Sequence, residues 1–292
     1  MRLGLHALGI GAGARPEIIR AVAESAELFG FATLWSGEHV VMVDRPMSVY
    51  PYSPDGRIAV PAGEDWLDPV LALTFAAAAA SRIGVATGVL LLPEHNPVMV
   101  AKQAATLDVL SGGRLTLGIG VGWSAEEFAA LGVPFARRGQ RTAEYVTAMR
   151  RLWSDDVASF SGEFVSFEAV RVNPKPVRDR RIPVVFGGNS DAALRRVASY
   201  GDGWYGFNLT AAAAAERIAT LERFCEREGR ARSELSVAIA LTDGDPSMVP
   251  SLAEAGVTEL VLVGTPPAEP AAAAAWVGDL AARWDLAPMP SV

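Results

Sequence analysis

Short apolar runs alternate along the chain with longer segments in which apolar residues recur every three or four positions. The first such pair is a run at 2–8 followed by a segment at 16–30. In that segment helical spacing relates Ile18, Ile19, Val22, Ala26 and Phe29. Gly30 ends the predicted helix. The pattern therefore predicts a strand followed by a helix.

The same alternation continues through the chain and predicts eight strand–helix units. The further strands are predicted at 31–36, 83–92, 115–119, 183–186, 203–207, 235–241 and 260–263, and the further helices at 69–81, 97–110, 125–131, 138–153, 191–200, 211–228, 248–255 and 271–284. Eight such units in 292 residues, with no large block left over, predict an α/β chain with one (β/α)8 TIM-barrel domain over 1–292. Continuous apolar strands such as 88–92 suit a parallel sheet covered on both faces. A doubly wound sheet is the competing fold.

Two segments break this rhythm. The first, 43–66, contains four prolines together with Tyr50 and Tyr52, and it follows the second strand. Long loops in compact domains often act as lids, and this one is expected on the catalytic face of the barrel. The second, 160–176, is predicted as a hairpin at 160–167 with a proline-rich return on the same face.

Composition and charge narrow the function classes. Half of the residues are apolar and the formal charge is −7, so the chain lacks the basic surface that nucleic acid or an anionic membrane would need. Cys225 is the only cysteine, which excludes an intrachain disulfide and a cysteine-based zinc site. Apolar stretches at 3–14 and 71–80 are interrupted or too short to serve as a signal peptide or a membrane span. A cytoplasmic protein without a membrane or nucleic-acid partner is expected.

One glycine motif offers a competing function. The stretch 9–14 matches Gly-x-Gly-x-x-Ala between a strand and a helix, and Glu38 stands where a dinucleotide-binding fold places its ribose-binding acid. A Rossmann dehydrogenase also needs a second domain for its substrate, and the chain offers none. A flexible turn between strand and helix is the favoured interpretation.

The candidate catalytic residues are Glu38 and His39, just beyond the second strand. Catalytic groups of TIM barrels gather at the carboxyl ends of the strands. A neutral imidazole can give or take a proton near pH 7. The alternative is a purely structural histidine. With His6 and His95 as the only other histidines, and no HxH or HExxH pattern, no metal site is predicted.

Glycines mark the ends of three other strands. A glycine inside an apolar strand often marks the close approach of a ligand, and alternate glycines leave a flat surface for a planar ring. The candidates for binding a cofactor ring are Thr87, Gly88 and Val89 after the third strand and Gly120, Val121, Gly122 and Trp123 after the fourth.

A third glycine turn precedes the helix at 191–200. Gly187, Gly188 and Asn189 would offer backbone N–H groups to an anion at that helix N-terminus. A simple helix cap is the alternative. Arg195 and Arg196, further along the helix, are expected to form a solvated face.

Taken together, these residues resemble the luciferase-like monooxygenase superfamily, whose cofactors are FMN or the deazaflavin coenzyme F420. The matching segments span roughly residues 1–265, and they are 35–39, 87–93, 95–97, 103–123, 138–153, 183–188 and 201–204. The Glu38-His39 pair is most similar to the F420-dependent oxidoreductases within this superfamily.

The resemblance implies roles for these residues. His39 would lie beside the deazaflavin as proton donor or acceptor, with Glu38 orienting it. It also implies a cis peptide bond at Gly88–Val89. The ring would be lined by 120–123, and the ribityl phosphate would be bound by 187–189.

The expected function is hydride transfer between F420 and a small organic substrate. The alternative is an FMN-dependent two-component monooxygenase, which would need a reductase partner. A barrel that only carries the cofactor is a third option. Trp123 stands where the sugar-phosphate dehydrogenases of this branch have a glutamate, and no lysine follows Lys175, so a sugar phosphate is not expected. Relatives of this kind are commonly homodimers; the sequence itself leaves the oligomeric state open.

Overall fold

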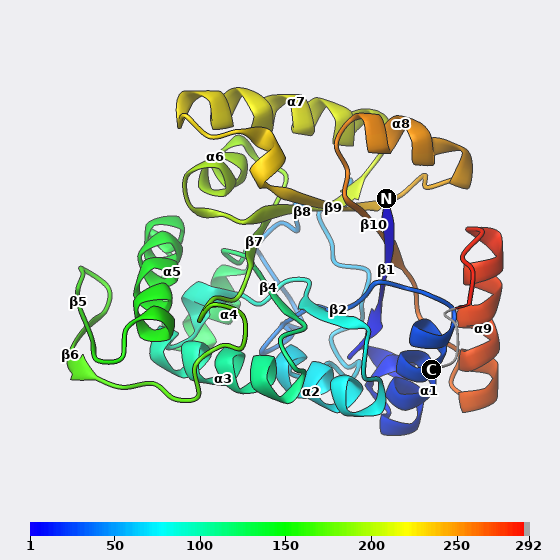
Figure 1. The fold of residues 1–292 in the computed structure, drawn as a ribbon, viewed down its shortest axis with the longest axis horizontal. Coiled ribbons are helices and arrows are strands. Elements are labelled where there is room, and N and C mark those ends of the chain that lie inside the picture. Colours follow the sequence, from blue (N-terminus) through cyan, green and yellow to red (C-terminus); the bar gives the residue numbers. More distant parts are fainter. Residues whose placement is uncertain (289–292) are drawn as a thin grey trace.

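The computed structural model describes residues 1–288, and its centre is a closed barrel of eight parallel strands (Figure 1). Around the barrel the order is β1-β10-β9-β8-β7-β4-β3-β2. The barrel strands are β1 (Arg2–Leu8), β2 (Thr33–Ser36), β3 (Gly84–Thr87), β4 (Leu115–Ile119), β7 (Val184–Gly187), β8 (Gly203–Leu209), β9 (Ser236–Leu241) and β10 (Glu259–Val263). The predicted TIM barrel is thus confirmed and the doubly wound sheet is excluded.

Helices surround the strands, as the βα alternation requires (Figure 1). The helices are α1 (Pro16–Leu28), α2 (Pro69–Ala79), α3 (Pro97–Leu110), α4 (Ala125–Ala130), α5 (Arg138–Ser154), α6 (Asp191–Tyr200), α7 (Ala211–Arg227), α8 (Val249–Glu254) and α9 (Pro270–Arg283). Four short 3-10 helices are η1 (Gly11–Ala14), η2 (Leu92–Glu94), η3 (Arg232–Glu234) and η4 (Pro246–Met248). The first and last helices pack against each other and close the outer ring.

The third strand is shorter than predicted. β3 ends at Thr87, and the peptide bond Gly88–Val89 is cis, as the resemblance implied. The Thr87 hydroxyl and the Leu90 amide both donate to the carbonyl of Gly118 on β4, at 2.6 and 2.8 Å. The ladder is therefore interrupted over the two residues between them, and this bulge projects at the end of the strand.

The predicted hairpin is present and packs along the outer side of α5. Its strands are β5 (Ala158–Ser161) and β6 (Ser166–Val170), and it packs outside α5 (Figure 1). At its tip the backbone N–H groups of 163–165 donate to Glu144 on α5. The return is tied by Lys175, whose ammonium donates to the carbonyls of Leu152 and Asp155 at the end of α5. The prediction that 160–176 lies on the catalytic face is wrong for the proline-rich return, which lies at the carboxyl end of α5, whereas the hairpin tip lies beside the first turns of that helix.

The glycine motif at 9–14 forms a turn between strand and helix, as the favoured interpretation predicted. It forms a turn and the 3-10 helix η1, and Gly9 and Gly11 adopt positive φ angles of 88° and 53°. The strands on either side belong to the closed barrel, so no dinucleotide-binding sheet is formed.

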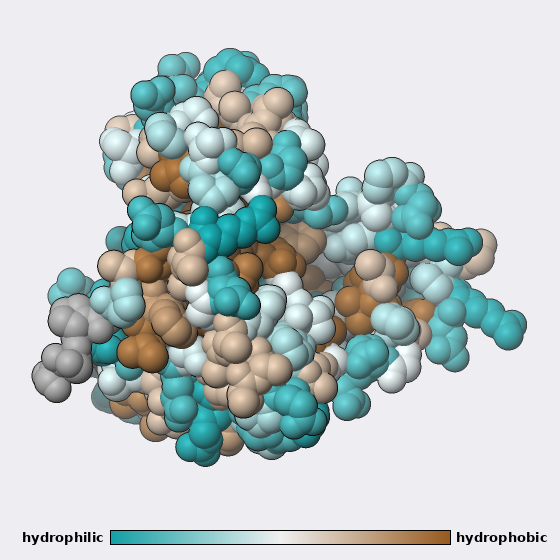
Figure 2. All heavy atoms as spheres, turned by 90° about the vertical axis from the view of Figure 1, so that its right-hand side faces the viewer, coloured by the Kyte–Doolittle hydropathy of each residue, from teal (hydrophilic) through white to brown (hydrophobic). Residues whose placement is uncertain are grey.

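The surface mixes polar and apolar residues. On the side formed by α1 and α9, apolar residues gather in a hollow near the middle of the view (Figure 2). Within 1–288, no helix combines the length and the apolar character needed to cross a membrane.

Candidate active site

His39 lies three residues beyond the end of β2 and is held by a glutamate from another element. Its Nδ1 lies 2.8 Å from Oε2 of Glu127, and the two side chains are only 7% and 1% exposed. Oε1 of Glu127 accepts from the amides of Val40 and Val41, at 2.7 and 3.3 Å. A carboxylate can only accept, so Nδ1 carries the hydrogen and Nε2 is left to exchange a proton.

Glu38 does not have the role expected of it. Its Oε2 accepts from the amide of Leu91 at 2.6 Å, and both oxygens lie 3.0–3.1 Å from Nε2 of His95. Burial lowers the pKa of His95, but the hydrogen bond and charge of Glu38 outweigh it, so the pKa is raised. The prediction that Glu38 orients His39 is therefore wrong: Glu127 does so, and Glu38 forms a second pair with His95.

A third carboxyl group, that of Glu94, lies near enough to feel the negative charges of Glu127 and Glu38. Its side chain is buried, and among the described residues neither oxygen has a hydrogen-bond partner. Burial, followed by the negative charges of Glu127 and Glu38, raises its pKa to about 9. At neutral pH Glu94 is therefore an uncharged acid.

Aromatic side chains enclose His39. Its ring stands nearly perpendicular to those of Trp66 and Trp123, with centroid distances of 4.9 and 5.7 Å. Tyr50 packs on Trp123, and Tyr52 packs on Phe207 of β8, with centroids 5.2 and 5.7 Å apart.

The segment 43–66, which supplies Tyr50 and Tyr52, therefore covers the strand ends, as predicted, and is called the roof segment below. Beneath it, a small cavity of about 20 Å³ borders His39 and Trp123. Burial raises the pKa of Tyr50 to about 12, so its hydroxyl is neutral.

The barrel interior below the bulge is aromatic and neutral. Trp35 and Tyr205 stack at 4.7 Å, and the Tyr205 hydroxyl lies 3.0 Å from Nδ1 of His6. Burial lowers the pKa of His6 to about 4. A Cβ atom at Gly88 would lie 3.1 Å from Trp35 and 3.3 Å from His6, so a larger residue would crowd both rings at this point of the bulge.

Glycines at the ends of two strands, β4 and β7, lie against the side chain of Val89 from the β3 bulge. A Cβ atom on Gly120 or Gly187 would lie 2.7 or 2.8 Å from a methyl group of Val89. The side chain of Val89 thus reaches from the bulge to the tips of β4 and β7, and the lining of a planar ring by these strand ends stays a prediction. Thr87, Gly88 and Val121 lie at the same strand ends, and Gly122 and Gly188 take φ angles of 74° and 107° that favour glycine.

The side chain of Asn189 forms its hydrogen bonds within the protein. Its Nδ2 donates to the carbonyl of Phe207 at 2.7 Å, and its Oδ1 accepts from the amide of the same residue at 3.3 Å. Ser190 is the N-cap of α6. The side chain of Asn189 therefore fastens the turn to β8 and leaves the backbone of 187–189 as the donor of any anion contact.

Two arginines beside this turn were not predicted as ligands. Arg196 lies against the start of α5, where a Cβ atom on Gly139 would be 3.0 Å from its guanidinium, and among the described residues its buried Nε has no partner. Burial and the nearby charge of Arg138 lower its pKa. Neither guanidinium has a carboxylate partner among the described residues, which makes this pair a candidate for binding an anion. Arg195, in contrast, faces solvent over the ring of Phe224, as expected for both arginines.

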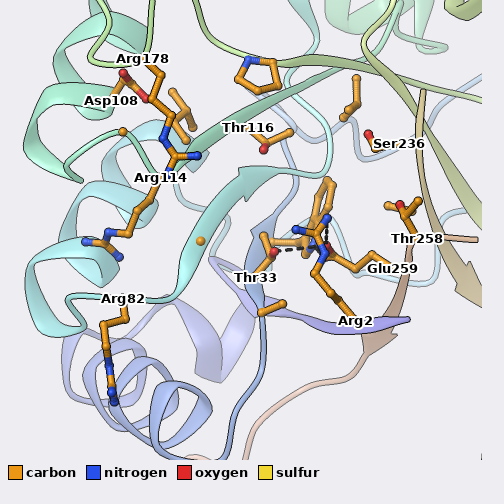
Figure 3. Close-up of a pocket in the computed structure, with 18 of the residues that line it drawn as sticks. Arg2, Thr33, Arg82, Asp108, Arg114, Thr116, Arg178, Ser236, Thr258 and Glu259 are labelled. Carbon is orange, nitrogen blue, oxygen red and sulfur yellow. Dashed lines mark hydrogen bonds and ion pairs between the residues drawn. The ribbon is translucent and has the colours of Figure 1, made fainter. Parts of the chain in front are cut away.

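A larger cavity, of about 240 Å³, opens at the opposite end of the barrel (Figure 3). It is lined at the amino ends of the strands by polar groups that bind one another: Arg2 pairs with Glu259 at 3.2 Å, and Glu259 accepts from Trp35 Nε1 at 2.8 Å. Arg114 donates to the carbonyls of Ser111 and Ala77. These contacts stabilise the barrel base, far along the strands from His39, as expected for this face of a TIM barrel.

Comparison with known proteins supports the same family. The sequence profile of the luciferase-like monooxygenases matches residues 3–242. The protein Rv0953c of Mycobacterium tuberculosis is 36% identical over 267 residues, which are 90% of this chain and 92% of that protein. The FMNH2-dependent dimethylsulfone monooxygenase of Pseudomonas putida is 36% identical over 131 residues, which cover 44% of this chain and 36% of the enzyme.

Solved structures share the fold. The monooxygenase RslO1 of Streptomyces bottropensis has a TM-score of 0.78 at 19% identity, covering 97% of this chain and 98% of that one. The coenzyme F420-dependent tetrahydromethanopterin reductase of Methanopyrus kandleri has a TM-score of 0.73 at 17% identity, covering 94% and 97%.

Proposed function

Because the chain belongs to the luciferase-like monooxygenase family, a family of oxidoreductases, we propose that it transfers a hydride between coenzyme F420 and a small organic substrate. The observation that carries this proposal is the pairing of His39 with Glu127 at the strand ends, beside the bulge at Gly88–Val89. The pair can manage one proton next to a redox ring. Enzymes with F420 and enzymes with FMN both occur among the similar proteins.

The residues present fit a flat cofactor that carries a phosphate. Val89, seated between Gly120 and Gly187, would support the ring, because no side chain projects from the two glycines beside it. The backbone of 187–189 and the guanidinium groups of Arg138 and Arg196 would hold the phosphate. The unpartnered Nε of Arg196 supports this assignment. When bound, the deazaflavin supplies or accepts the hydride.

The proton is handled by His39. With Nδ1–H held by Glu127, Nε2 takes a proton from an alcohol or, once the ring is charged, gives one to the reduced substrate. The carboxylate of Glu127 stabilises the charged ring and fixes its orientation. Trp66, Trp123 and Tyr50 exclude water from the cavity and favour an apolar or aromatic substrate.

The second candidate is an FMN-dependent monooxygenase supplied with reduced flavin by a partner reductase. The local identity of 36% to the dimethylsulfone monooxygenase supports it, although that match covers less than half of either chain. The flat floor and the arginine pair suit FMN as well as F420.

Titration of the purified protein with F420, with FMN and with NADPH tests the proposal. We expect quenching of F420 fluorescence with saturation at micromolar concentration and weaker binding of the other two. Tight FMN binding with none of F420 would select the second candidate, and tight NADPH binding alone would refute both.

Two variants then separate chemistry from binding. His39→Ala should lower turnover by about 100-fold or more while F420 affinity changes little. Arg196→Met should weaken F420 binding about tenfold or more, because a charged hydrogen bond is lost, whereas exposed Arg195→Met should not. A His39→Ala protein with full turnover would refute the assigned role, and a binding protein inactive with enones, imines and alcohols would indicate a carrier.

A further inference from the structure

The roof segment carries a tyrosine, Tyr52, whose ring is held in place while its hydroxyl has no hydrogen-bond partner among the described residues. The ring packs nearly at a right angle on Phe207 of β8, with centroids 5.7 Å apart. The backbone carbonyl of Tyr52 accepts from Nδ2 of Asn208 at 2.5 Å. Both anchors come from the end of β8, so Tyr52 is fixed to the barrel there and its hydroxyl is left for another group.

This hydroxyl faces the glycine turn that precedes α6. A Cβ atom on Gly188 would lie 3.6 Å from the Tyr52 oxygen. The oxygen therefore stands beside the backbone N–H groups that an anion would use at the start of this helix. The turn is joined to the same strand end, because Asn189 bonds to the amide and the carbonyl of Phe207. The end of β8 thus holds the turn and the roof tyrosine side by side.

The chemistry around the hydroxyl suits an anion with several acceptor oxygens. Burial raises the pKa of Tyr52, and the positive charge of Arg196 opposes this only in part, so the hydroxyl is neutral at pH 7 and can donate. The buried Nε of Arg196 has no partner, and no carboxylate among the described residues bonds to Arg196 or to the hydroxyl. A neutral donor and a cation without a counter-ion therefore face the same turn, and a phosphate can accept from both.

We propose that the Tyr52 hydroxyl donates a hydrogen bond to the phosphate of the cofactor, so that the roof segment supplies one wall of the phosphate site. This rests on the proposed function, since F420 and FMN both carry that phosphate. A phosphate bonded to Tyr52 stabilises the closed roof, and the closed roof strengthens phosphate binding by the same factor. A cofactor analogue without the phosphate has no such effect.

Paired titrations isolate the contribution of the phosphate. FMN and riboflavin differ only in that group, and F420 is paired with its ribityl deazaflavin, which lacks the phosphate and everything beyond it. Tyr52→Phe removes the hydroxyl and keeps the ring that packs on Phe207. Its affinity for the phosphate-bearing member should fall about tenfold or more, because a hydrogen bond to a charged group is lost, while affinity for the other member should change less than about threefold.

Tyr50→Phe is the matched control. Tyr50 lies in the same segment, but its ring packs on Trp123 on the side of His39. The affinity ratio of each pair should stay at its wild-type value in this variant. An unchanged ratio in Tyr52→Phe, a tighter binding of the phosphate-bearing member, or an equal loss in Tyr50→Phe would each overturn the proposal.

NMR with inorganic phosphate tests the same contact without a cofactor. The chain has five tyrosines, and the Tyr52 ring signal is the one missing from Tyr52→Phe. Phosphate should shift this signal and the amide signal of Gly188 with one midpoint, and it should slow amide hydrogen exchange in the roof segment. In Arg196→Met the midpoint should rise about tenfold.

A Tyr52 ring that does not respond to phosphate, whether or not Gly188 does, would overturn the proposal. Failure of the wild type to bind F420 and FMN would count against the proposed function instead. Since the phosphate experiment needs neither cofactor, the two failures are distinguishable.

Discussion

The substitution Glu127→Gln tests the orientation of His39 most directly. In the wild type, Oε1 of Glu127 accepts from two backbone amides, and Oε2 faces His39 Nδ1. A glutamine has one acceptor and one donor group at these two positions. Its carbonyl will stay with the amides of Val40 and Val41, so its NH2 group must face Nδ1. The imidazole then accepts at Nδ1 and carries its hydrogen on Nε2, which is the reverse of the wild-type tautomer.

The expected size of the effect follows from the role assigned to Nε2. General acid–base catalysis by a positioned group contributes about 10²- to 10⁴-fold. A ring with the wrong tautomer and no neighbouring carboxylate should lose most of this, which corresponds to about 3–5 kcal/mol of transition-state stabilisation. Both amides keep an acceptor, so the variant should fold, with stability reduced by about 1–3 kcal/mol for the lost charge-assisted bond.

Two measurements decide the outcome. 15N NMR of the cofactor-free protein reports which ring nitrogen of His39 is protonated, and it should show the exchange of tautomers. Turnover with F420 should fall about 100-fold or more while the dissociation constant of F420 changes by less than about threefold. An unchanged tautomer, or full turnover in the exchanged one, would refute the reasoning. Asp108→Asn is the control for substituting a buried acidic side chain, because Asp108 accepts from the amide of Val177 and lines the cavity at the other end of the barrel.

Three other predictions concern stability, the roof and the phosphate site. Folded Glu94 holds its proton up to about pH 9, whereas the unfolded chain releases it near pH 4.5. Wild-type stability relative to Glu94→Gln should therefore decline between these values by up to about 1.4 kcal/mol per pH unit, measured by urea unfolding at a series of pH values; parallel curves would exclude the shift. Glu126→Ala should speed amide hydrogen exchange in the roof segment 43–66 about tenfold, because Glu126 accepts hydrogen bonds from that segment. These bonds lower the pKa of Glu126 to about 2, so in the wild type the protection of the segment against exchange should be lost only as pH falls from 4.5 towards that value. Gly188→Ala, at a φ of 107°, should weaken F420 binding with little loss at a matched exposed site such as Gly63→Ala; equal effects would argue against a role for the turn.

The barrel was predictable because its signals are local. Each strand and helix has its own apolar period, and the glycines at 120, 122, 187 and 188 follow strand ends that a parallel barrel must bring together. The proline-rich return after the hairpin was misplaced for a topological reason. The strand pattern of the hairpin is visible in the sequence, but the end of the barrel at which the return lies depends on the length and direction of α5.

The partner of His39 was not predictable from spacing. Ser124 and Glu127 form the pattern of a helix cap, and Ser124 does cap α4, but the glutamate turns to a residue 88 positions earlier in the chain. Glu94 follows the predicted strand at 83–92, and no motif in the sequence marks it as buried. Arg195 and Arg196 differ only by about 100° of helix rotation, which a repeat of apolar positions in so short a helix does not fix.

Two adjacent residues of α4 perform separate tasks. Glu126 binds the backbone of Met47 and Ser48 in the roof, while Glu127 binds His39. The short helix is thus a common anchor for the cover and for the acid–base group. A tilt of α4 large enough to release the cover would also draw the carboxylate away from the imidazole, so an open active site would be one in which proton exchange is switched off.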